Sequence, residues 1–113
     1  MKPIELVPTD APVTIVATAP VHHLCPFVNE ADHGRVTAVW TCNGSTVELH
    51  SLAAYLDGFT ERSISHEDLV DEVFERLGEA APDITVASVT ARFTTAGITV
   101  EISRAVPGHA IGT

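Results

Sequence analysis

The sequence predicts an α+β domain in which a four-stranded antiparallel sheet carries two helices on one face. Two extended segments rich in β-branched residues come first, a stretch of helical periodicity follows, and two more extended segments come last. Two hairpins that flank a helical pair are typical of an antiparallel sheet covered on one side, so the expected order is ββααββ. The length suits one domain over residues 1–113, with an extended lead-in at 1–11 and a loose tail at 107–113.

The first half of the chain predicts two strands separated by a long loop. Residues 12–18 and 35–42 have the alternation and the β-branched content of strands. Residues 19–34 contain two prolines, a glycine and three of the six histidines, so we expect a loop there, and loops of this length often carry function. An Asn-Gly pair at 43–44 predicts a turn, which a short extended segment at 46–49 follows.

A first helix is predicted where the apolar spacing changes. Four large apolar residues recur at i, i+3, i+4 and i+7: Leu52, Tyr55, Leu56 and Phe59. This spacing places them on one helical face. Ser51 is the expected N-cap, because its hydroxyl can accept a hydrogen bond from a free backbone N–H.

A second helix is predicted to begin after Ser65, an N-cap with Asp68 three residues further on. Its apolar face consists of Leu69, Val70, Val73, Phe74 and Leu77. Gly78 is the residue expected just beyond the helix end, and Pro82 closes the segment.

The remaining sequence predicts a second hairpin. Residues 84–93 and 98–102 are extended segments, and Thr-Ala-Gly at 95–97 turns the chain between them. A four-stranded sheet of this kind has exposed edges, which assembly of subunits side by side into a closed barrel would cover.

Composition disfavours nucleic acids and membranes as partners. The formal charge is −9, and the six Lys and Arg residues are spread over the chain without a cluster. Tight binding to tRNA or DNA needs concentrated cations, so a weakly charged small molecule is the better partner. The apolar runs are too short for a membrane span, and the N-terminus has no export signal. These features predict a cytoplasmic location.

A cysteine is the first candidate for chemistry. Pro26 biases Cys25 away from the helical region, so the thiol is expected on a loop, and Asp32 follows seven residues after it. A thiolate and a nearby proton donor are the minimum needed to add sulfur to an electrophilic carbon. The alternative interpretation is that Cys25 and Cys42 are core residues and Asp32 a turn residue. A disulfide between the cysteines is disfavoured in a reducing cytoplasm.

Four pieces of sequence together resemble one family. They are Cys25, Asp32, the segment Val-Glu-Leu-His-Ser-Leu at 47–52 and Ser-His-Glu-Asp at 65–68. Their order on a ββααββ frame resembles the QueF and QueF-like family of the tunnelling fold over roughly residues 22–103. The resemblance implies enzymes that process the nitrile of 7-cyano-7-deazaguanine, built as homo-oligomers that form a barrel with active sites shared between subunits.

The resemblance also implies catalytic roles. Cys25 matches the nucleophile that adds to the nitrile carbon and forms a covalent thioimide. Asp32 matches the acid that protonates the nitrile nitrogen. His66 matches a histidine beside the reacting carbon, with a proton-handling or orienting role.

Substrate-binding residues follow from the same resemblance. Glu67 matches the glutamate that anchors the guanine-like edge of the base, and a carboxylate suits that edge because it accepts two parallel hydrogen bonds. Glu48, with Ser51 and Leu52, matches the segment that helps to hold the heterocycle. Without the family pattern, Glu48 and Glu67 would be ordinary surface carboxylates.

Two positions depart from the family's reductases. Those enzymes have lysines for the NADPH phosphates where this chain has His50 and Ala53, and alanine cannot bind a phosphate. We therefore expect no redox cofactor, and a thioimide resolved by ammonia or another amine donor to an archaeosine-type amidine. Two alternatives remain open: a reductase that holds NADPH differently, with Arg62, Arg76 or a neighbouring subunit, and a non-catalytic module that binds a purine or pterin.

The histidines between the first two strands suggest a metal site as a further alternative. His22, His23, Cys25 and His33 fall close together in the sequence. Their spacing is not that of a standard zinc motif, and no second pair follows at a finger-like distance. We therefore predict no bound metal.

Overall fold

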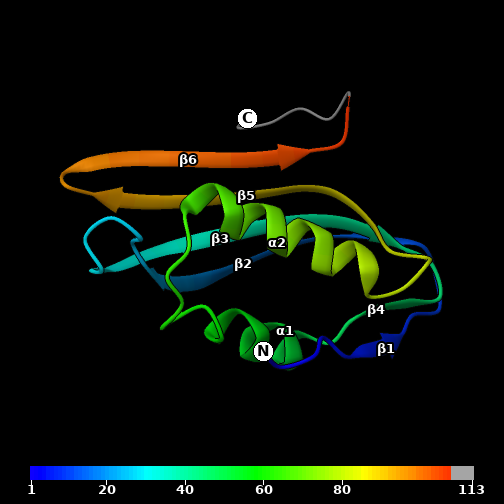
Figure 1. Ribbon diagram of the computed structural model, residues 1–113. Coiled ribbons are helices and arrows are strands. Elements are labelled where there is room, and N and C mark those ends of the chain that lie inside the picture. Colours follow the sequence, from blue (N-terminus) through cyan, green and yellow to red (C-terminus); the bar gives the residue numbers. More distant parts are fainter. Residues whose placement is uncertain (108–113) are drawn as a thin grey trace.

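The computed structural model describes residues 1–107, and its main sheet has four antiparallel strands. The strands are β2 (Val13–Leu24), β3 (Ala31–Cys42), β5 (Thr85–Thr95) and β6 (Ile98–Ala105), in the spatial order β2-β3-β5-β6 (Figure 1). Each hairpin pairs consecutive strands, and β3 joins the two hairpins by pairing with β5. The predicted four-stranded antiparallel sheet is confirmed.

Two helices lie on one face of this sheet. α1 (Leu49–Asp57) packs against β2, and α2 (His66–Glu79) packs over β5 and β6 (Figure 1). A second, small sheet pairs β1 (Leu6–Pro8) with β4 (Ser45–Val47), so part of the expected lead-in is a strand. The predicted order of two strands, two helices and two strands is confirmed for the main elements. No helix among residues 1–107 is long and apolar enough to cross a membrane.

The prediction of a long loop over residues 19–34 is wrong. β2 continues to Leu24 and β3 begins at Ala31, so only residues 25–30 connect them. Pro20 does not interrupt the sheet, because β2 is an edge strand and a residue without an N–H is tolerated there. The histidines in this stretch are therefore strand residues that alternate between the two faces of the sheet.

The predicted cap of α1 is also wrong. The N-cap is Glu48, whose carboxylate accepts hydrogen bonds from the backbone N–H groups of His50 (2.6 Å) and Ser51 (3.0 Å). These bonds lower the pKa of Glu48. The Ser51 hydroxyl instead donates to the Glu48 carbonyl and accepts from the Glu5 backbone N–H, both at 2.8 Å.

The prediction for α2 is correct at its start and wrong at its end. The Ser65 hydroxyl caps the helix by accepting from the Asp68 N–H at 3.1 Å. Gly78 lies inside the helix, which ends at Glu79 with Ala80 as the C-cap in a right-handed conformation. A left-handed residue is not needed where the chain turns immediately into the Pro82 segment.

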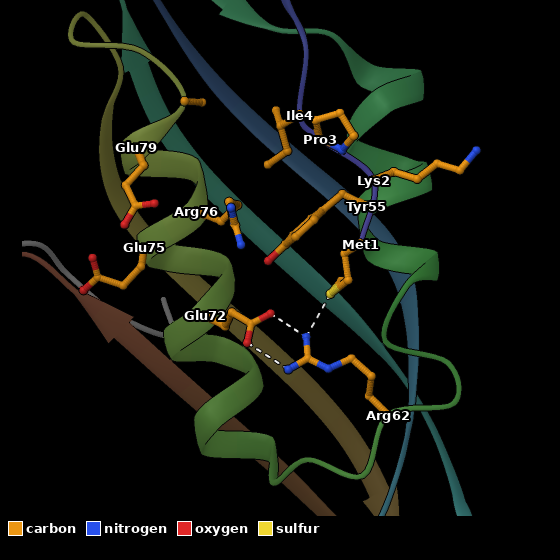
Figure 2. A pocket seen from close by; sticks show the side chains of 11 residues that line it. Met1, Lys2, Pro3, Ile4, Tyr55, Arg62, Glu72, Glu75, Arg76 and Glu79 are labelled. Atoms are coloured by element: carbon orange, nitrogen blue, oxygen red, sulfur yellow. Dashed lines mark hydrogen bonds and ion pairs between the residues drawn. The ribbon is translucent and has the colours of Figure 1, made fainter.

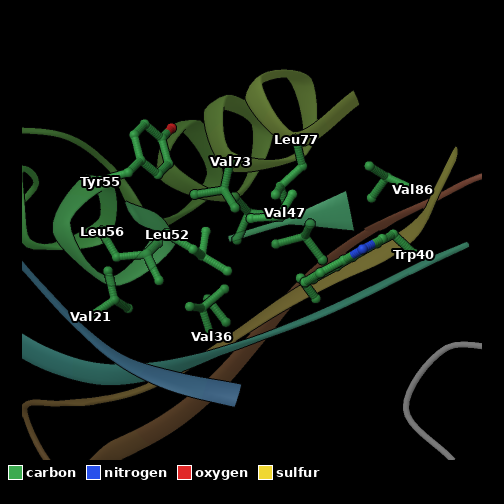
Figure 3. Packing of buried hydrophobic residues seen from close by; sticks show 14 of the residues in the cluster. Val21, Val36, Trp40, Val47, Leu52, Tyr55, Leu56, Val73, Leu77 and Val86 are labelled. Carbon is green, nitrogen blue, oxygen red and sulfur yellow. The ribbon is translucent and has the colours of Figure 1, made fainter. Parts of the chain in front are cut away.

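The hydrophobic core fills the space between the helices and the sheet. Figure 3 shows Tyr55, Val73 and Leu77 of the helices above Val36 and Trp40 of the sheet. Other fully buried large side chains are Phe59, Leu69, Phe93 and Val89. Burial of these apolar surfaces is the main term that stabilises the domain.

Cys42 belongs to this core. The alternative interpretation of the cysteines as core residues is therefore correct for Cys42. Both cysteines are free, and Cys42 is buried whereas Cys25 is partly buried.

The predicted turn between β5 and β6 is confirmed, with φ of 54° at Ala96 and 78° at Gly97. Two consecutive left-handed residues are the geometry of a two-residue hairpin turn. The loose tail was predicted at 107–113, and all of it after Pro107 lies outside the residues that the structure describes.

Gly34 of β3 permits a close contact with Arg92 and Phe93 of the neighbouring strand β5. A Cβ at this position would lie 2.4 Å from the Arg92 carbonyl oxygen and 2.5 Å from Cδ1 of Phe93. We expect Gly34→Ala to lower the free energy of unfolding by about 1–3 kcal/mol, because both the Arg92 backbone and the ring of Phe93 must move. Urea unfolding followed by Trp40 fluorescence measures this.

The matched control is Gly78→Ala within α2. There the nearest atom to a new Cβ is Val86 Cγ2 at 3.9 Å, so no clash arises. Alanine is favoured over glycine inside a helix by about 1 kcal/mol, so this variant is expected to be more stable than the parent. Equal stability of the two variants would contradict the packing argument.

Candidate active site

A pocket of about 190 Å³ lies where the β2–β3 connection meets the start of α2. Its walls include Cys25, Asp32, His66, Glu67 and Thr95. These residues come from a loop, two strands and a helix, so only the folded chain brings them together. The pocket therefore contains all three of the predicted catalytic residues and one of the four predicted substrate-binding residues.

Backbone hydrogen bonds tie the end of β2 to the segment that leads into α2. The Leu24 N–H donates to the Arg62 carbonyl at 2.9 Å, and the Ile64 N–H donates to the Leu24 carbonyl at 3.2 Å. Leu24 also forms an isolated parallel bridge with Ser63. These bonds fix Cys25, the next residue, beside the first turn of the helix.

The connection itself is short and closed. The Cys25 N–H donates to the Glu30 carbonyl at 2.9 Å, and the Asn29 N–H donates to the Cys25 carbonyl at 2.8 Å. Asn29 has a φ of 56°, a left-handed conformation that asparagine tolerates. The thiol is thus held on a turn, as expected, although that turn is much shorter than the loop that was predicted.

Asp32 is the central polar group of the pocket. It is 8% exposed, and one carboxylate oxygen, Oδ2, lies 3.2 Å from Nε2 of His66 and 3.7 Å from Nε2 of His23. The other oxygen, Oδ1, accepts a hydrogen bond from the hydroxyl of Thr95 at 3.2 Å. A buried carboxyl group with two imidazoles and a hydroxyl around it is well placed to exchange a proton.

His23 lines this pocket, although its sequence context suggested only a role in metal binding. Its ring is 1% exposed, and Nδ1 donates to the Leu24 carbonyl at 3.2 Å, which leaves the lone pair on Nε2. Burial lowers the pKa of His23 and so favours the neutral ring. The strand register pairs His23 directly with Asp32 across the hairpin. This pairing can be predicted from the sequence only if both strands are taken to extend this far.

The ring of His66 is held by aromatic neighbours. It stacks on Phe93 with centroids 4.3 Å apart and planes 6° apart, and it meets the ring of His23 edge to face at 4.9 Å. His66 is the first residue of α2, and Glu67, which follows it, is exposed in the first helical turn at the pocket. The positive end of the helix dipole favours the negative charge of Glu67 there.

The other predicted substrate-binding residues do not line this pocket. Glu48 caps α1 and Leu52 is a core residue that is 6% exposed. Ser51 bonds to Glu5 and Glu48. A role for these three residues at the pocket would need a second copy of the chain to bring them there, and that role stays a prediction.

The positions discussed for NADPH also lie elsewhere. His50 is on α1 with a fully exposed side chain that contacts the Glu48 carboxylate at 3.1 Å. Arg62 and Arg76 line a separate, larger pocket of about 710 Å³, where Arg62 forms two hydrogen bonds to Glu72 at 2.6 and 3.0 Å (Figure 2). The Arg62 guanidinium is therefore already paired with the Glu72 carboxylate.

The four-residue metal set suggested by the sequence does not come together. Strand alternation places His22 and His33 on the face opposite to His23, with their Nδ1 atoms 2.8 Å apart. His23 and Cys25 face the pocket instead. Within residues 1–107, the group of ligand-type side chains that does converge is His23, Asp32 and His66.

The fold and the pocket define an α+β domain with a cysteine, a carboxyl group and imidazoles at one candidate catalytic site. The chain belongs to the QueF-like protein family, whose model matches residues 31–107. The matched region includes Asp32, His66 and Glu67 and begins after Cys25.

Curated relatives and a solved structure are similar to this chain. An NADPH-dependent 7-cyano-7-deazaguanine reductase of Prochlorococcus marinus is 34% identical over 59 residues, which is 51% of this chain and 43% of the relative. A reductase of the same description from Nitratiruptor is 33% identical over 79 residues, 67% of this chain and 60% of the relative. The chain thus spans about half the length of the curated relatives it matches.

The crystal structure of the archaeosine synthase QueF-Like in the apo form has the same fold. Its TM-score to this chain is 0.76 at 20% sequence identity, over 84% of this chain and 94% of that structure. At this identity the similarity establishes the fold.

Proposed function

We propose that this chain is an enzyme of 7-deazaguanine metabolism that adds Cys25 to the nitrile of 7-cyano-7-deazaguanine. The resulting thioimide is resolved by ammonia or another amine to an amidine. The observation that carries the proposal is the meeting of Cys25 with the Asp32–His66 pair in one pocket. The names of the curated relatives, 7-cyano-7-deazaguanine reductases, support the choice of this nitrile as the substrate.

The first step joins sulfur to carbon and hydrogen to nitrogen. The Cys25 sulfur attacks the nitrile carbon while Asp32 gives its proton to the nitrile nitrogen, and the triple bond becomes a C=N double bond. The proton lost by the thiol returns to Asp32 through His66, whose Nε2 lies 3.2 Å from Oδ2. A nitrile is a poor electrophile until its nitrogen is protonated, so the acid matters as much as the thiol.

The second step replaces sulfur by nitrogen. Ammonia adds to the thioimide carbon, the C–S bond breaks and Cys25 recovers a proton from the incoming nitrogen. The sum is addition of one ammonia to one nitrile, with no change in oxidation state. The reaction therefore needs no redox cofactor.

Substrate recognition is assigned to Glu67 and Phe27 at the pocket entrance. The Glu67 carboxylate can accept two parallel N–H bonds from the guanine-like edge of the base. The Phe27 ring lines the pocket and is 97% exposed, so it offers an apolar face on which a flat heterocycle can stack. The acidic chain favours the free base over a base embedded in tRNA.

Reduction by NADPH is the second candidate, because the curated relatives carry that activity in their names. His50 and Ala53 argue against reduction by NADPH, because they occupy the positions at which the resemblance to the reductases implies lysines for the cofactor phosphates. A reductase would have to hold the phosphates with other groups. Arg76 lines the same pocket as Arg62, which is already paired with Glu72.

The two candidates differ in their second reactant, and one assay separates them. The protein is incubated with the nitrile and either ¹⁵N-ammonium or NADPH, and the mass of the product is measured by mass spectrometry. We expect an amidine with one ¹⁵N atom and no change in NADPH absorbance. Consumption of NADPH with formation of an amine product would establish the reductase. Binding of the nitrile without either product would favour the non-catalytic module.

A further inference from the structure

We propose that His23, Asp32 and His66 form a binding site for a zinc ion, with an open coordination position toward the pocket of Cys25. The three side chains come from β2, β3 and α2, and their ligand atoms all lie within 4.8 Å of one another. Two imidazoles and one carboxylate are a ligand set that zinc takes in sites with a free fourth position. This inference of metal binding stands on geometry and is independent of the proposed reaction.

The two distances from Asp32 to the imidazoles are close to those of a tetrahedral site. Ligand atoms about 2.1 Å from zinc stand about 3.4 Å apart in a tetrahedron. Oδ2 of Asp32 lies 3.2 Å from Nε2 of His66 and 3.7 Å from Nε2 of His23. The ligand nitrogens of the two imidazoles lie within 4.8 Å of each other, so the rings must turn toward Asp32 to bring all three atoms into the first coordination sphere.

His23 supplies the observation that points most directly to a cation. Its Nε2 is buried and has no hydrogen-bond partner among the residues that the structure describes. Because Nδ1–H is bound to the Leu24 carbonyl, the lone pair of Nε2 faces the carboxylate of Asp32. Two electron-rich groups that face each other in a buried space are stabilised by a cation between them.

Groups around the three ligands hold them in place, as is usual at metal sites. The Thr95 hydroxyl binds the second oxygen of Asp32, and the ring of Phe93 fixes the plane of His66. These contacts restrict the orientations that Asp32 and His66 can adopt.

Zinc at this site would occupy the atoms that the proposed reaction uses for proton transfer. Oδ2 of Asp32 and Nε2 of His66 would both be bound to metal, so neither could serve the nitrile nitrogen. This consequence rests on the proposed function, and it makes zinc an inhibitor that a chelator removes.

Equilibrium dialysis of the full chain against zinc alone tests the site. We expect one zinc per chain for the parent protein and at least a tenfold weaker affinity for His23→Gln and for His66→Gln. His66 is more exposed than His23, at 17% against 1% of its side chain, so His66→Gln keeps the test valid if His23→Gln fails to fold. Circular dichroism checks the fold of each variant.

His22→Gln is the matched control, because it removes the neighbouring histidine from the opposite face of the sheet. Unchanged zinc affinity in this variant and in Cys25→Ala is expected. Loss of zinc by His22→Gln with retention by His23→Gln would place the ion at the His22–His33 pair and overturn the proposal. No binding by the parent protein at micromolar zinc would also overturn it, as would loss of zinc by Cys25→Ala.

The inhibitory consequence is measured separately. Zinc is expected to slow formation of the covalent adduct with the nitrile in proportion to occupancy, and EDTA to restore it. Zinc binding without any effect on adduct formation would contradict the proposed roles of Asp32 and His66 and leave the metal site standing.

Discussion

Cys25→Ala is expected to abolish the covalent adduct with 7-cyano-7-deazaguanine completely. Alanine has no nucleophilic atom, and the other cysteine, Cys42, is 3% exposed in the core. The measurement is the intact mass of the protein after incubation with the nitrile. The parent protein is expected to gain the mass of one nitrile and the variant to gain none.

Cys42→Ala is the matched control and is expected to form the adduct normally. An adduct on Cys25→Ala would contradict the proposed nucleophile. No adduct on the folded, reduced parent protein would remove both enzyme candidates. In that case, binding that Glu67→Gln loses and Cys25→Ala keeps would establish a non-catalytic purine-binding module.

Asp32→Asn is expected to slow adduct formation by about 10²–10⁴-fold, the usual contribution of a positioned general acid. Asparagine keeps the shape of the side chain and can still accept from Thr95, so the pocket is expected to stay folded. Its amide cannot deliver a proton to the nitrile nitrogen. A quenched time course of the adduct mass measures the rate.

Asp68→Asn provides the control, since Asp68 is an exposed carboxylate in the first turn of α2 and does not line the pocket. Its rate is expected to match that of the parent protein. A normal rate for Asp32→Asn would assign the acid role to another group, and His66 is the nearest one to test.

Much of the fold was predictable because its signals are local. The i, i+3, i+4 spacing gave both helices, the Ser65 cap needed only its own first turn, and the turn at Ala96 and Gly97 needed only its own residues. The prediction of Cys25 outside regular structure was likewise local, because Pro26 restricts the residue before it.

The errors arose where pairing partners decide the structure. Residues 19–34 have several features of a loop, but the edge position of β2 accommodates Pro20 and the ladder continues to Leu24. Glu48 displaced Ser51 as the cap of α1 because its longer side chain reaches two N–H groups at once.

By itself, the sequence determined the ββααββ order, the family resemblance and the set of Cys25, Asp32, His66 and Glu67 as candidates. Only the tertiary structure showed that His23 and Thr95 join Asp32, and that Glu48 and Leu52 stay outside the pocket of the same chain. The physical reason is sequence distance: Thr95 lies 63 residues from Asp32, and no local pattern reports the strand register that brings them together.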